Sequence, residues 1–230
     1  RKEADMSRGP DFKSLIWGGV LLLLAACVPL FANGYWMSIA LTIAMFTVLA
    51  TSWSLFSGPT HYISLATAAF FGVGGYLVGT GMSDYNMGFW PMVAIAPVVG
   101  AALAFLIGIA TLRLSGVYFV IFTLGLAEMI RTLVSWIQNN FTGSRGLYVL
   151  TDLTEADIYI YLVILAAVVY LAGWWVNRSR LGFALRIIGN DETVARHVGI
   201  NTATSKVILF TFSGFVAALV GALIAPRYTY

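Results

Sequence analysis

The residues best placed to do chemistry lie in the segment 177–205, which joins two apolar stretches and is rich in charged side chains. Its pattern is typical of two short helices, because Asn190 or Asp191 can cap the second helix and Gly199 can end it. Two apolar faces are expected on these helices, made of Phe183, Ile187 and Ile188 and of Val194, Ala195 and Val198. Such a segment either rests on anionic lipid or forms a docking surface for a soluble partner.

Groups suited to catalysis are few. His61 and His197 lie on separate loops, neither stands next to a nucleophile, and Cys27 is the single cysteine. Their spacing does not match a metal site, and the sequence has no Gly-rich phosphate-binding loop ending in Lys-Ser or Lys-Thr. We therefore expect that the chain is not an enzyme and holds no metal. Any nucleotide hydrolysis is expected on another chain.

The elements that carry these residues are predicted to be membrane-spanning helices. Of the 230 residues, 60% are hydrophobic and 10% are charged, and no Asp, Glu, Lys or Arg occurs between Lys13 and Asp84. A helix of about 20 apolar residues crosses the hydrocarbon core, and these runs lack the alternation of barrel strands. The sequence predicts an all-α, polytopic integral membrane helical bundle. About seven apolar segments are expected, at 12–31, 34–56, 61–82, 90–112, 116–137, 156–176 and 206–226.

The third segment, 61–82, is the least regular of the seven. It is so rich in small residues that a short, broken or re-entrant helix is as consistent with it as a full span. The glycines between Gly72 and Gly81 predict close contact with neighbouring helices, because lipid provides no hydrophobic drive for helix association.

The basic residues predict the orientation, because cytoplasmic loops carry the excess of Lys and Arg. If all seven segments cross, ten of the 13 basic residues share the side of the N-terminus: Arg1, Lys2, Arg8, Lys13, Arg113, Arg178, Arg180, Arg186, Arg196 and Lys206. The N-terminus and the segment 177–205 are therefore predicted to be cytoplasmic, and the loop 138–155 external. A re-entrant third segment would reverse the later loops, and the charges argue against it.

One run within the segment 177–205 carries a family resemblance. Residues 182–200 read Gly-Phe-Ala-Leu-Arg-Ile-Ile-Gly-Asn-Asp-Glu-Thr-Val-Ala-Arg-His-Val-Gly-Ile. This run resembles the cytoplasmic coupling segment of the permeases of branched-chain amino acid ABC importers. Three further stretches are similar to the same family in order and spacing: Ser64 to Tyr76, Arg113 to Glu128, and Lys206 to Leu223.

The resemblance covers about residues 35–226 and is closest to the LivM-type member of the permease pair. Two departures from the family are visible. Ala66-Thr67 stands where the family usually has Gly-His, and the family's final helices do not follow residue 226. We therefore expect more apolar segments in the full protein.

The resemblance implies a single transmembrane permease domain over 1–230, located in the bacterial inner membrane and crossing it several times. Its implied partners are a second homologous permease, two cytoplasmic ATPase subunits, a periplasmic substrate-binding protein and the lipid bilayer, with no nucleic acid. No cofactor is expected in this chain, because ATP would be bound by the partner subunits. Coupling to the ATPases is assigned to Gly182, Arg186, Asn190, Glu192, Ala195, Arg196 and Gly199.

The substrate path is expected to be mainly apolar, which suits Leu, Ile or Val side chains. The charged ends of an amino acid need hydroxyl groups or helix dipoles, and Ser64, Thr67, Tyr118 and Thr123 are the candidates. Glu128 and Arg131 are the only oppositely charged pair inside an apolar segment, three residues apart on one helical face. A structural ion pair is the favoured interpretation, and a place for Glu128 in the substrate path is the alternative.

Other substrates and mechanisms remain open at this point. Urea, short amides and aromatic acids are handled by similar permeases. A stand-alone secondary transporter would need carboxylates or ion sites near the midplane, where Glu128 is the one candidate, and an intramembrane enzyme would need a nucleophile with a base. An importer subunit is therefore the favoured prediction.

Overall fold

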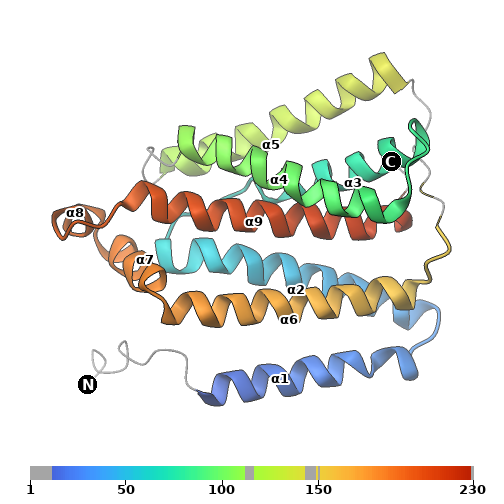
Figure 1. Ribbon diagram of the computed structural model, residues 1–230, viewed down its shortest axis with the longest axis horizontal. Coiled ribbons are helices and arrows are strands. Elements are labelled where there is room, and N and C mark those ends of the chain that lie inside the picture. The colour runs from blue at the N-terminus through green and yellow to red at the C-terminus, as the bar shows by residue number, and fades with distance from the viewer. Residues whose placement is uncertain (1–11, 112–116, 143–148, 150, 229–230) are drawn as a thin grey trace.

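The computed structural model describes residues 12–111, 117–142, 149 and 151–228, and every regular element within them is a helix. The long helices lie side by side in one bundle, as Figure 1 shows, which confirms the all-α polytopic prediction. The helices are α1 (Phe12–Ala26), α2 (Tyr35–Thr60), α3 (Thr67–Ser83), α4 (Phe89–Thr111), α5 (Val117–Ile137), α6 (Glu155–Arg178), α7 (Arg180–Asn190), α8 (Glu192–His197) and α9 (Thr202–Ile224).

Some residues used in the sequence predictions lie outside the described residues. They are Arg1, Lys2, Arg8 and Arg113, residues 112 and 114–116 at the ends of two predicted segments, and residues 143–148 and 150 of the loop 138–155.

The number of spanning segments differs from the prediction of seven. Among the described residues, five helices are long and apolar enough to cross a membrane: α2, α4, α5, α6 and α9. The segments predicted at 12–31 and 61–82 contain the shorter helices α1 and α3. Residues Val28–Leu30 form a separate 3₁₀ turn after α1, and residues 61–66 are not helical, because His61 adopts a left-handed conformation that ends α2. Hydropathy alone does not detect either break.

The non-helical segment 61–66 runs from the end of α2 back along the bundle to α3. Its backbone is satisfied by side chains, as apolar surroundings require. Trp53 Nε1 donates a hydrogen bond of 2.8 Å to the carbonyl oxygen of Ser64, and the Leu65 N–H donates one of 3.2 Å to the Thr123 hydroxyl. The third segment is therefore a short helix with an extended lead-in, one of the forms predicted for it.

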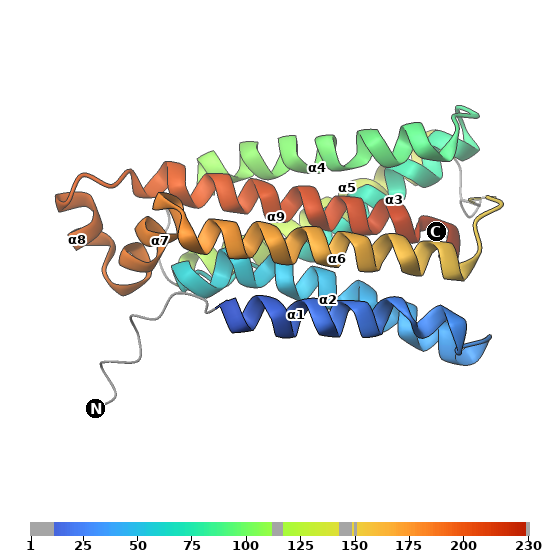
Figure 2. The ribbon, with the colours of Figure 1, turned by 60° about the horizontal axis from the view of Figure 1, so that its bottom comes forward.

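Helix α9 lies at the centre of the bundle, where it packs against α3, α4 and α2, and Figure 2 shows it between α4 and α6. Most of its side chains are buried. Glycines bring its neighbours close: a Cβ at Gly74 of α3 would meet the Ala218 carbonyl oxygen, and one at Gly221 of α9 would meet the Phe71 carbonyl oxygen. The predicted close contact is found at Gly74 and Gly81, whereas Gly72 has open space beside it.

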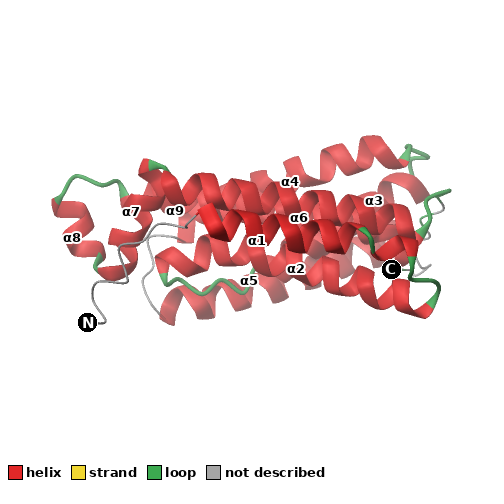
Figure 3. Cartoon of the chain, turned by 90° about the horizontal axis from the view of Figure 1, so that it is seen from below, coloured by secondary structure: helices red, strands yellow, loops and turns green. Residues whose placement is uncertain are grey.

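The two short helices α7 and α8 lie together at one end of the bundle, away from the turn between α3 and α4 (Figures 1 and 3). The chain reaches them from α6 and leaves them into α9. Helix α2 also ends there, so that α7 contacts the C-terminal part of α2. The bundle therefore presents the segment 177–205 as a separate cap on one end.

Candidate functional site

Helix α7 is fixed to the end of the bundle by small residues. Its buried face consists of Gly182, Leu185 and Ile188, at helical spacing. A Cβ at Gly182 would meet the Val176 carbonyl oxygen of α6, and one at Gly189 would meet the Pro59 carbonyl oxygen of α2. Replacing either glycine would force α7 away from the spans, so α7 sits on them with little freedom to slide.

Single residues fix both ends of helix α8, as the sequence predicts. The Asp191 carboxylate accepts hydrogen bonds from the N–H groups of Thr193 and Val194, and these bonds lower the pKa of Asp191. Gly199 has a φ of 84° and follows the last turn. Ala195 is fully buried and holds α8 against the bundle.

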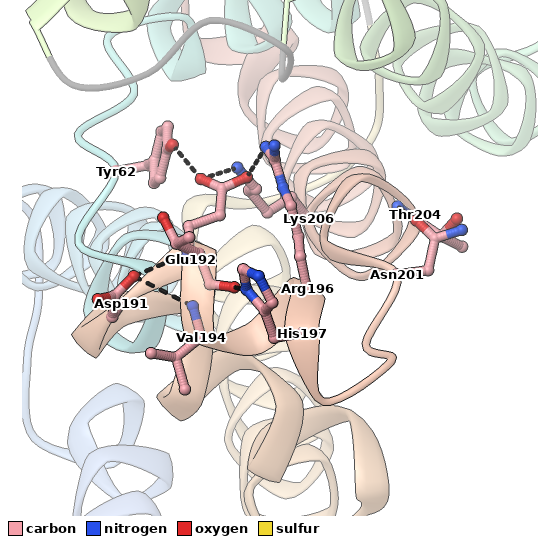
Figure 4. A network of polar contacts seen from close by, with 10 residues as sticks. Tyr62, Asp191, Glu192, Val194, Arg196, His197, Asn201, Thr204 and Lys206 are labelled. Atoms are coloured by element: carbon pink, nitrogen blue, oxygen red, sulfur yellow. Dashed lines mark hydrogen bonds and ion pairs between the residues drawn. The ribbon is translucent and has the colours of Figure 1, made fainter.

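A network of charged and aromatic groups centres on Glu192, the first residue of α8 (Figure 4). Its Oε2 accepts a hydrogen bond of 2.7 Å from the Tyr62 hydroxyl and lies 2.9 Å from Lys206 Nζ, and its Oε1 lies 2.8 Å from Arg196 Nη2. Lys206 Nζ also lies 4.2 Å from the centre of the Tyr62 ring. One carboxylate therefore joins α8 to the segment 61–66 and to the first turns of α9.

The network is electrostatically demanding because the Lys206 side chain is buried. Partial burial of Glu192 opposes its ionisation, but hydrogen bonds from Lys206, Tyr62 and Arg196 outweigh burial and lower the pKa of Glu192 to about 2. Burial and the bond to Glu192 raise the pKa of Tyr62. Glu192 therefore stays ionised and Tyr62 stays protonated throughout the physiological pH range.

Of the other predicted coupling residues, one supports the junction of two helices and one is exposed on the surface. Arg186 donates to the carbonyl oxygens of Gly182 and Asn177, so it braces the junction of α6 and α7. Asn190 is exposed at the end of α7. The predicted apolar face of Phe183, Ile187 and Ile188 is only partly turned toward the bundle: Ile188 is buried and Phe183 is exposed, because α7 rests on α2 and α6 along Gly182, Leu185 and Ile188.

The candidates for the substrate path do not form one site. Ser64 and Thr67 line a groove between α2 and α3, whereas Glu128 lines a cavity between α3 and α5. The Thr123 hydroxyl is buried and already bonded, to the Leu65 N–H and to the Val120 carbonyl oxygen. Tyr118 is exposed near the start of α5.

Sequence reasoning missed the two partners that bury the Glu192 carboxylate. Tyr62 and Lys206 are 130 and 14 residues from Glu192 along the chain. A lysine in the first turns of a strongly apolar helix was the available signal for Lys206, since such a charge needs a partner. No group of three or more His, Cys, Asp or Glu side chains comes together in the part of the chain that the structure describes.

Comparison with known proteins matches residues 35–230 to the family described as the permease component of branched-chain amino acid transport systems. The high-affinity branched-chain amino acid transport system permease protein LivM of Escherichia coli K12 is 27% identical over 251 residues, covering 95% of this chain and 59% of that protein. LivM of Salmonella typhimurium LT2 gives the same values. The chain therefore spans 59% of the length of these relatives.

A shorter match is to a permease of a sugar transport system. The L-arabinose transport system permease protein AraH of Escherichia coli K12 is 31% identical over 70 residues, covering 30% of this chain and 21% of that protein. No solved structure matches the chain. The family match covers most of the sequence and agrees with the apolar helices, so the chain is a multi-pass membrane protein that belongs to the family of branched-chain amino acid transport system permease components, of the LivM type.

Proposed function

We propose that the chain is a permease subunit of a bacterial inner-membrane ABC importer for branched-chain amino acids. It acts with a second homologous permease, two cytoplasmic ATPase subunits and a periplasmic binding protein. The family match over residues 35–230 supports the permease class. The observation that carries the coupling role is the Glu192 network, in which one carboxylate of α8 holds both the segment 61–66 and α9. A force applied to α8 is passed directly to α3 and to the central helix of the bundle.

Transport then follows from alternating access. Closure of the ATPases moves α7 together with the ends of α6 and α2, since Gly182 and Gly189 keep α7 in close contact with these two helices. The packed spans shift between inward-open and outward-open arrangements, because close-packed helices move as rigid bodies.

The outward surface of α7 and α8 supports a docking role. Phe183, Val194 and Val198 are each more than half exposed, and the exposed Arg186 and Arg196 side chains lie on the same two helices. An apolar group rimmed by charges is typical of a protein contact surface. The alternative is a linker that rests on lipid.

Docking is tested by placing a charge in this surface. We expect Val198→Asp and Phe183→Asp each to lower the ATPase recovered with the purified permease about tenfold or more, the effect of losing one well-buried contact. Tyr85→Asp is the matched control, because Tyr85 is equally exposed but lies in the turn between α3 and α4 at the other end. Normal ATPase recovery with all three variants would support the lipid-resting linker.

Orientation is tested by cysteine labelling in a Cys27→Ser background. We expect an impermeant thiol reagent added outside intact cells to label Asp152→Cys and to leave Asn190→Cys unlabelled, because the basic residues predict a cytoplasmic segment 177–205. Both positions are exposed in the structure. Labelling of Asn190→Cys without Asp152→Cys would reverse the proposed orientation.

The substrate class is tested with the whole complex in liposomes. Uptake of radiolabelled leucine is expected to require ATP, both ATPase subunits and the binding protein, and to be inhibited by isoleucine and valine. Inhibition by urea, short amides or aromatic acids alone would assign one of these alternatives. Leucine uptake without the ATPases would instead indicate a secondary transporter.

A further inference from the structure

The cavity between α3 and α5 combines features that are not used by the Glu192 network. It has a volume of about 490 Å³, within the range of roughly 300–1,000 Å³ typical of small-molecule sites. Most of its lining is apolar, from residues such as Val73, Leu124, Ile130 and Val134. Its polar groups are Tyr76 on α3 and Glu128, Arg131, Ser135 and Gln138 on and just after α5.

The two charged groups of this cavity are paired with each other, but each can form further hydrogen bonds. Arg131 Nη2 and Nε donate to the Glu128 carboxylate at 2.7 to 3.2 Å. The side chains are 77% and 62% exposed respectively, so no described part of this chain covers them. A guanidinium has five N–H donors and a carboxylate about four acceptor positions, so each group can take a further partner of opposite charge.

A third polar group lines the same cavity from α3. The Tyr76 hydroxyl is buried and makes no hydrogen bond to any described residue. A buried hydroxyl without a partner is costly, so a small turn of the Tyr76 side chain toward a ligand atom in the cavity would gain a hydrogen bond. The cavity thus offers an anion site and a cation site next to an apolar wall, with the unpartnered Tyr76 hydroxyl buried within that wall.

The position of the cavity also fits a solute rather than lipid. An ion pair exposed to lipid tails is unfavourable, so these side chains face protein or an aqueous space. The lining extends along α5 from Leu124 to Gln138, at the end remote from α7 and α8, and Figure 1 shows α5 diverging from the bundle toward that end. The cavity therefore lies on the side where the proposed function expects the substrate to arrive.

We propose that this cavity is a subsite for the zwitterionic head group of an aliphatic amino acid. Arg131 binds the substrate carboxylate, Glu128 binds its ammonium group, and the Tyr76 hydroxyl donates to the carboxylate. The aliphatic side chain lies against Val73 and Ile130. This assignment rests on the proposed importer function and adds to it the groups that recognise the substrate within the membrane.

Protection of a cysteine from labelling tests the subsite in the assembled complex. In a Cys27→Ser background, Ser135→Cys places a thiol in the cavity wall. Millimolar leucine is expected to slow its labelling by a small thiol reagent about tenfold, whereas leucinamide and 4-methylpentanoate, which each lack one charged end, are expected to give little protection. Tyr85→Cys, exposed in the turn between α3 and α4, is the control and is expected to show no protection.

Variants of the Glu128–Arg131 ion pair distinguish recognition of the substrate from a purely structural role. Arg131→Gln and Glu128→Gln are expected to abolish protection by leucine, and the charge swap Glu128→Arg with Arg131→Glu is expected not to restore it, because the swap moves the anion site along α5 relative to Tyr76. Recovery of both assembly and protection in the swap would overturn the subsite in favour of a structural pair.

Leucine uptake by the unmodified complex distinguishes the two proposals. Uptake with no protection at Ser135→Cys overturns the subsite alone. Absence of both uptake and protection overturns the proposed substrate class together with the subsite. Equal protection by all three compounds shows nonspecific occupation of the cavity and also overturns the assignment.

Discussion

Replacing Glu192 by glutamine is expected to lower the free energy of unfolding by about 2–3 kcal/mol. Glutamine keeps the size of the side chain, but it leaves the buried Lys206 ammonium without the carboxylate that lies 2.9 Å away. The expected loss is at the low end for buried pairs because 20% of the Glu192 side chain is exposed and water reduces the interaction. Thermal unfolding of the purified permease in detergent measures the change.

Two control variants distinguish the buried Glu192–Lys206 ion pair from the exposed Glu192–Arg196 ion pair. Arg196→Gln removes an ion pair whose arginine is 65% exposed, so a change below about 1 kcal/mol is expected. Glu192→Gln combined with Lys206→Met removes both buried charges and is expected to recover much of the loss. Equal destabilisation by Arg196→Gln and Glu192→Gln would contradict the central place of Lys206 in the network.

The Glu192–Lys206 ion pair also predicts the direction in which the stability of the folded state changes with pH. The Glu192 pKa is lowered from 4.5 to about 2, so ionised Glu192 stabilises the folded state fully above pH 4.5. That contribution is lost progressively as the pH falls from 4.5 toward 2. Unfolding temperatures measured from pH 7 down to pH 2 are expected to fall less steeply in Glu192→Gln, which has no carboxylate to titrate at this position, and the two proteins should differ in slope mainly below pH 4.5.

The parts of the fold that local chemistry determines could be predicted from the sequence. Asp191 and Gly199 fix the ends of α8 because a capping carboxylate and a positive φ are properties of single residues. The long apolar runs likewise predict α4 and α6 to within a few residues. Such features depend on residues close together in the chain.

The parts that depend on contacts between distant residues could not be predicted in the same way. The segment 61–66 is held in place by Trp53 of α2 and Thr123 of α5. These contacts cannot be read from the sequence, so the apolar composition of the segment predicted that it was part of a membrane span. Phe183 has the same polarity as Leu185, and only the position of α2 and α6 decides which of them is buried. Tyr62 is 130 residues from Glu192 in the chain, and only the packing of the bundle brings the two side chains together.

Replacing Gly74 by alanine is expected to destabilise the bundle by about 1–3 kcal/mol, because the new methyl group overpacks a tight contact. The added Cβ would meet the Ala218 carbonyl oxygen, which belongs to the backbone of α9 and cannot rotate away. Helix α3 must then move off the central helix, and it carries the segment 61–66 with it. Assembled permease recovered from the membrane and its unfolding temperature in detergent both report the loss.

The matched control is Gly72→Ala, two residues away on the same helix. A Cβ at Gly72 has nothing within 4 Å, and alanine favours a helix over glycine by up to about 1 kcal/mol, so an unchanged or higher unfolding temperature is expected. The two variants make the same chemical change, and opposite signs would therefore measure the α3–α9 contact itself. A gain in stability at both positions would show that α3 and α9 are not in close contact at Gly74.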